Sequence, residues 1–145
     1  MSEIFPGQHE ANRRMDEFLD SLGIGSYSPG EIRVMRAHLA MTERAFAKAL
    51  GVSRIAVQRW ESGERAISDA NAERLDRLMA HVEGLERSAI DAIRGAAIAD
   101  QTFIIYRDDE HLREHHPDSP LTADTILAIA GRVYAATGCA VVVAS

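Results

Sequence analysis

Hydrophobic residues recur every three or four positions along most of the chain, the spacing that puts side chains on one face of an α-helix. The first such stripe predicts a helix over residues 8–22, with Met15, Phe18, Leu19 and Leu22 on its apolar face. Gly23 and Gly25 end it, and residues 26–30 have the composition of a linker. Residues 1–28 are therefore predicted to be an N-terminal helix and linker.

Three short helices are predicted next, over Glu31–Ala40, Glu43–Leu50 and Arg54–Ser62. Thr42 and Ser53 stand just before the second and third of them, where a side-chain oxygen can accept hydrogen bonds from free backbone N–H groups. Gly51 and Gly63 follow the same two helices and suit the left-handed residue that commonly ends a helix. The block therefore has the helix start and stop signals of a small helical domain.

A longer helical stretch starts at Ser68 or Asp69 and is predicted to run to about Asp100, with Gly84 and Gly95 as points where it could break or kink. Two β-branched and aromatic runs then predict short strands. The elements expected after the long helix are a strand at Phe103–Tyr106, helices at about Asp108–His115 and Thr122–Thr137, and a strand at Cys139–Val143. The fold class expected is mainly α, a helical domain followed by a small α+β unit.

A two-stranded sheet is marginal in water by itself, so this unit needs either the long helix beneath it or a second copy of itself. Cys139 lies in the last apolar run and is expected to be a small core residue.

Charge is unevenly distributed along a chain whose net charge is −6. Between Glu31 and Arg65 seven cations face four acids, a balance of +3, whereas the chain before that block has a balance of −3 and the chain after it −6. Screening limits the reach of a charge to about 10 Å, so a local basic block can attract phosphate in an acidic protein.

The compositional signals exclude several classes of protein. No apolar run approaches the ~20 residues of a membrane span, the first residues do not have the pattern of a secretion signal, and Cys139 is the only cysteine. We therefore expect a cytoplasmic protein without a disulfide or a thiolate metal site. The histidines at 111, 115 and 116 favour a solvated helix end over a metal site, and no cofactor motif stands out.

The basic block also meets the spacing rules of a helix-turn-helix that reads DNA. Ala47 is small enough for two helices to approach, and Gly51 can take the positive φ of the turn. Apolar residues that can hold the second helix against the first are Phe46, Leu50, Val52, Val57 and Trp60. The opposite face of that helix presents Arg54, Ile55, Gln58 and Arg59, side chains suited to base edges in the major groove.

These residues resemble the Cro/C1-type helix-turn-helix family, also called phage-repressor-like or xenobiotic-response-element type. The similar segments are Glu31–Arg36, Leu39–Thr42, Phe46–Ala47, Leu50–Ser53 and Val57–Gly63. The resemblance implies a lambda-repressor-like helical DNA-binding domain over residues 29–80, an Arg36–Glu61 pair, and double-stranded operator DNA as partner. The DNA-binding residues expected are Thr42, Arg44, Ser53, Arg54, Ile55, Gln58, Arg59, Ser62 and Arg65. Glu43 departs from the glutamine frequent in the family, which puts a phosphate contact there in doubt.

The whole chain further resembles YdiL-like proteins and anti-CRISPR-associated autorepressors, through Tyr106, the Pro117–Asp118 turn and Tyr134–Val143. That resemblance implies that residues 81–145 are a helical connector and a dimerisation domain, and that the protein is a homodimeric repressor of its own or a neighbouring promoter.

Two further functions compete with this one. An antitoxin would use the same DNA-binding domain and neutralise a partner protein with its C-terminal region. An enzyme is disfavoured, because the tail has no nucleophile–base pairing and no phosphate-binding loop.

Overall fold

The computed structural model describes Arg14 and residues 27–145, and the helix predicted over residues 8–22 lies outside these described residues except for Arg14. The helices are α2 (Pro29–His38), α3 (Glu43–Leu50), α4 (Arg54–Ser62), α5 (Asp69–Gly95), α6 (Asp109–His115) and α7 (Ala123–Thr137), with a short 3-10 helix, η1, at Ile98–Asp100 and strands β1 (Thr102–Ile105) and β2 (Ala140–Val143). The predicted order of elements, helices first and then strand–helix–helix–strand, is confirmed.

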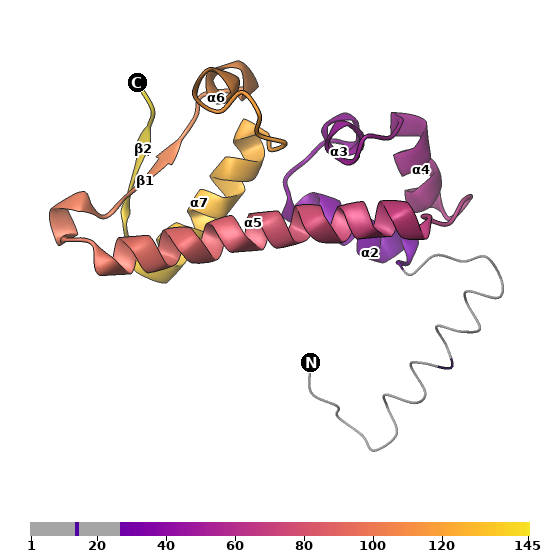
Figure 1. Ribbon diagram of the computed structural model, residues 1–145, viewed down its shortest axis with the longest axis horizontal. Helices are drawn as coiled ribbons and strands as arrows, with labels where there is room; N and C mark the ends of the chain where they lie inside the picture. Colours follow the sequence, from indigo (N-terminus) through magenta and orange to yellow (C-terminus); the bar gives the residue numbers. More distant parts are fainter. Residues whose placement is uncertain (1–13, 15–26) are drawn as a thin grey trace.

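Helix α5 runs along the length of the molecule and supports both parts of the fold (Figure 1). Helices α2, α3 and α4 lie along its first half, and α7 with the two strands lies along its second half (Figure 1). The helix is continuous through Gly84 and ends at Gly95, so it is shorter than predicted. A turn of 3-10 helix then leads the chain into β1.

Helix α2 begins two residues earlier than the sequence pattern indicates. Ser28 caps it reciprocally: the Ser28 hydroxyl accepts from the Glu31 N–H at 3.1 Å, and the Glu31 carboxylate accepts from the Ser28 N–H at 3.0 Å. Pro29 occupies the first helical position, where its missing N–H costs nothing. Helix α2 ends at His38, before Ala40 adopts a left-handed φ of 53°. The last two residues of the predicted linker, residues 29–30, therefore belong to α2.

One hydrophobic core joins the N-terminal helices to the C-terminal part. Phe46, Val57, Leu75, Val82 and Val133, which come from α3, α4, α5 and α7, belong to a single buried cluster. Burial of this kind contributes roughly 1.5–3 kcal/mol for each large side chain. The two parts therefore stabilise each other through α5, although they differ in sequence pattern.

Strands β1 and β2 form a parallel pair in which Thr102 lies opposite Ala140 and Ile105 opposite Val143. A parallel pair requires a long crossover, which α6 and α7 supply. Helix α7 packs against both strands, and α5 also contacts β1. The strand pair therefore has the helical cover that such a small sheet needs, and yet β2 is exposed along its whole length. Cys139, just before β2, is buried as predicted.

Candidate nucleic-acid interface

Helix α4 separates a buried face from an exposed one. Val57 and Trp60 are buried against the core, and Trp60 occupies the packing position that the sequence predicts. On the opposite face of α4, Arg54, Ile55 and Gln58 are exposed, and Ile55 exposes 58% of its surface. A β-branched aliphatic side chain this exposed has no packing role within the described chain, and it has the shape to contact a thymine methyl group.

The turn before α4 holds that face at a fixed angle to α3. Gly51 adopts φ +71°, a left-handed conformation that side chains with a Cβ rarely take. The Val52 N–H donates to the Ala47 carbonyl at 3.0 Å, and Ala47 is buried where the two helices meet. Thr42 and Ser53 cap α3 and α4, each accepting a hydrogen bond of 3.1 Å from the N–H three residues later. The predicted bounds of both helices are confirmed.

Arg36 and Glu61 form a bidentate pair that ties α2 to the end of α4. Arg36 Nε lies 3.0 Å from Glu61 Oε2 and Arg36 Nη2 lies 2.8 Å from Glu61 Oε1. Arg36 Nη1 also donates to the Met41 carbonyl at 3.2 Å, and hydrogen bonding to Glu61 raises the pKa of Arg36. A paired, hydrogen-bonded charge orients its neighbours more than it adds stability, so this pair fixes the direction in which α4 points.

Glu43 and Arg54 form a second, looser pair that the sequence analysis missed. Each is the first residue of its helix, and Arg54 Nε lies 3.6 Å from Glu43 Oε2. That carboxylate oxygen is buried and accepts no hydrogen bond. The signal was available in the motif, since Thr42 and Ser53 cap helices whose starts lie close together. A carboxylate at this place partly neutralises an arginine of the exposed face and limits where it can move.

The two ends of this surface are also rich in arginine and hydroxyl groups. Arg36, Thr42, Glu43, Arg44 and Arg54 border a shallow hollow of about 550 Å³ next to the start of α3. At the other end of α4, the Ser62 hydroxyl donates to the Arg59 carbonyl at 3.2 Å, and Arg59 Nε lies 3.8 Å from Glu64 Oε1.

The other polar residues predicted to contact DNA are all exposed, namely Thr42, Arg44, Ser53, Ser62 and Arg65. Helix N-termini and arginines are the groups that proteins use to contact DNA phosphates.

A known family matches the segment that carries these features. A family model described as helix-turn-helix matches residues 32–82, which include most of α2, all of α3 and α4, and the first half of α5. Residues 32–82 are therefore similar to the Cro/C1-type helix-turn-helix family of DNA-binding transcription regulators. No curated protein matches the chain.

Outside that segment, no helix in the described residues is both long and apolar enough for a bilayer. Within the same residues no group of three or more His, Cys, Asp or Glu side chains is arranged to hold a metal ion.

Proposed function

We propose that the protein is a sequence-specific repressor that binds an inverted repeat as a homodimer, in its own or a neighbouring promoter. The observation that carries the proposal is the outer face of α4, a helix whose opposite face is buried. On this outer face Arg54, Ile55 and Gln58 are exposed, and Arg59 is half-exposed. Arginine suits guanine, glutamine suits adenine and an aliphatic side chain suits the thymine methyl group. Thr42, Arg44, Ser53, Ser62 and Arg65 supply phosphate contacts around this face.

The homodimer follows from the size of the reading surface. One helix contacts only a few base pairs, too few to select one site among the competing sites of a genome. Two copies on half-sites about one helical turn apart double the sequence that is read. We assign DNA binding to residues 29–80 and pairing to residues 81–145.

The C-terminal part has exposed apolar surface that pairing would cover. Ile104, Leu127, Tyr134, Val141, Val142 and Val143 are each between 37% and 58% exposed. Among the described residues, the two-stranded sheet also has an unpaired hydrogen-bonding edge on each strand, which can accept another chain. A second copy of the chain would satisfy both features at once. An antitoxin would instead cover them with a different protein.

Selection of bound duplexes from a randomised pool by the full chain tests the DNA-reading part. We expect an inverted repeat whose half-sites are centred about 10 base pairs apart. Recovery of a single unrepeated site, or of no common sequence, would contradict the proposal.

Light scattering at micromolar concentration tests the pairing part, and a dimer is expected. Val143→Lys should yield monomers and lower operator affinity at least about tenfold, because a charge cannot be buried unpaired. Val34→Lys, at an exposed position of α2, is the matched control and should remain dimeric. A monomeric parent protein would favour the antitoxin function instead.

A further inference from the structure

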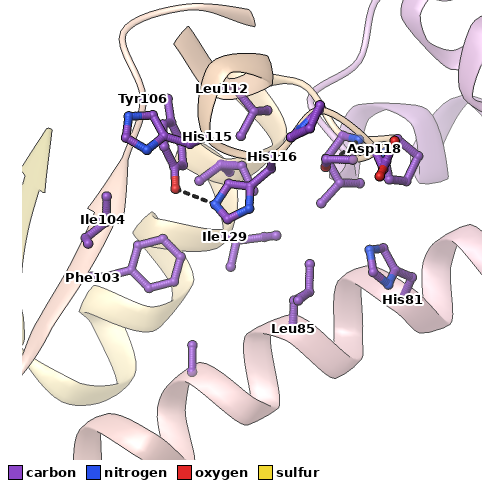
Figure 2. A pocket seen from close by; sticks show the side chains of 16 residues that line it. His81, Leu85, Phe103, Ile104, Tyr106, Leu112, His115, His116, Asp118 and Ile129 are labelled. Carbon is purple, nitrogen blue, oxygen red and sulfur yellow. Dashed lines mark hydrogen bonds between the residues drawn. The ribbon is translucent and has the colours of Figure 1, made fainter. Parts of the chain in front are cut away.

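A cavity of about 620 Å³ lies between α5, β1 and the α6–α7 segment (Figure 2). Its walls are apolar and come from four elements: Leu85, Ala89, Phe103, Leu112, Ile126 and Ile129. The volume falls in the range of roughly 300–1,000 Å³ found for small-molecule sites. The Phe103 ring and the side chains of Leu85 and Ile129 point into this space (Figure 2).

Polar groups also line the cavity. The Tyr106 hydroxyl and His116 Nε2 are 2.7 Å apart in a hydrogen bond, and His81 approaches from α5 across the cavity from Asp118 (Figure 2). None of the described residues that line the cavity is a lysine or an arginine. Imidazole and phenol groups can donate as well as accept hydrogen bonds, and Asp118 adds a carboxylate to the described lining. Such a set matches a hydroxyl group better than an anion.

The burial of His111 gives this corner of the molecule a fixed shape. The sequence predicts a solvated helix end for His111, His115 and His116, and this is wrong for His111, which is 2% exposed. Its Nδ1 accepts from the Arg107 N–H at 3.1 Å, and its ring lies edge-on to Tyr106 with centroids 5.6 Å apart. The ring of Tyr106 therefore packs against the buried His111, and its hydroxyl group forms the hydrogen bond with His116 at the cavity.

We propose that this cavity binds an uncharged small molecule with an aromatic ring and a hydroxyl group. The ring would pack between Phe103 and Leu85, and the hydroxyl would exchange hydrogen bonds with the Tyr106–His116 pair. The proposal concerns a site separate from the DNA-reading face, and it does not rest on the repressor function.

The position of the cavity brings its occupant close to the helix-turn-helix. His81 and Pro120 border this cavity and also a smaller hollow next to Ala49 and Leu50 at the end of α3. Leu121, the next residue of the same segment, belongs to the core cluster shared with α3 and α4. A bound molecule would therefore contact the segment that packs beside α3.

Calorimetry with three naphthalene probes tests the proposal on the full chain without DNA. We expect 2-naphthol to bind one-to-one with a Kd on the order of 0.1–1 mM, as its size allows. The anion 2-naphthoate should bind at least about tenfold more weakly, since burying a charge without a partner is costly. Naphthalene, which lacks the hydroxyl group, should also bind more weakly than 2-naphthol. No saturable binding of 2-naphthol, or equal binding of all three probes, would overturn the proposal.

Filling the cavity supplies the matching variant. Ala89→Phe places a ring in the cavity and should abolish 2-naphthol binding, whereas Val34→Phe adds the same ring on an exposed face of α2 and should leave it unchanged. Leu85→Trp replaces Ala89→Phe if that variant fails to fold, because Leu85 is already 39% exposed. Undiminished binding in a folded, filled variant would overturn the site. A filled variant that loses only self-association, with no probe bound by the parent, would assign the cavity to a second copy of the chain and would also overturn it.

Discussion

The hydroxyl group of Thr125, in α7, donates a buried hydrogen bond of 2.6 Å to the carbonyl of Leu39, 86 positions earlier in the chain. Leu39 is the C-cap residue that follows α2 and precedes the left-handed residue Ala40, so this bond joins the C-terminal part to the turn between α2 and α3. The Thr125 proton is committed to Leu39, and the neighbouring Thr122 hydroxyl, 2.8 Å away, must then donate to Thr125. The two parts of the fold are thus joined by a polar contact as well as by the shared core.

Thr125→Val should lower the free energy of unfolding by about 1–3 kcal/mol. Valine has nearly the shape of threonine but leaves the buried Leu39 carbonyl without a donor. Denaturant unfolding measures the change. An unchanged midpoint would mean that the carbonyl is satisfied in another way and that this contact does not join the two parts.

The Tyr27 hydroxyl group should ionise at a higher pH than an ordinary tyrosine. Its hydroxyl donates to Asp76 of α5, and this bond, together with partial burial and the charge of Asp76, raises the pKa of Tyr27 to about 12. The unfolded value is about 10, so stability from this bond is fully present below about pH 10 and is lost as the pH rises toward 12. Phenolate absorbance of the parent minus that of Tyr27→Phe should therefore show a midpoint near pH 12. A difference curve centred near pH 10 would rule out the bond.

Glu43→Gln should raise affinity for random duplex DNA by about three- to tenfold. The affinity should also fall more steeply as the salt concentration rises. The change removes a negative charge from a surface assigned to phosphates and releases Arg54, 3.6 Å away, from its partner. Selectivity at the base pair that we assign to Arg54 should fall in the same variant. Fluorescence anisotropy over a range of salt measures both effects.

Glu73→Gln, an equal change of charge at an exposed position of α5, is the matched control for that experiment. The same gain in random-DNA affinity in Glu73→Gln would show that net charge alone is responsible, and would remove the special role of Glu43.

Local signals in the sequence predict the helix-turn-helix well. Helices α3 and α4 begin and end where the Thr42 and Ser53 caps and the glycines at 51 and 63 indicate, because capping acts over three or four residues. The sequence pattern starts α2 two residues late because the Ser28-Pro-Gly run is typical of a linker, whereas Ser28 forms a capping box with Glu31.

Contacts between residues far apart in the sequence could not be predicted from these local capping signals. The Thr125–Leu39 bond spans 86 positions, and the burial of His111 depends on how α6 packs next to β1. The cavity that Phe103 lines likewise exists only once α5, β1 and α7 are assembled. Periodicity predicts which face of an element is apolar, but not which partner covers it or where the cover is incomplete.

The reading of bases by α4 is the central claim, and Arg59→Ala tests it most directly. Arg59 is 43% exposed at its side chain and lies on the same face as Ile55, steadied by Glu64. Affinity of the full chain should be measured on the selected operator, on operators changed at one base pair, and on random duplex. We expect Arg59→Ala to lose about 1–3 kcal/mol of binding free energy on the operator and much less on random DNA, with relaxed selectivity at one base pair. An equal loss on operator and random DNA would contradict this expectation, because Arg59 would then contact only phosphate.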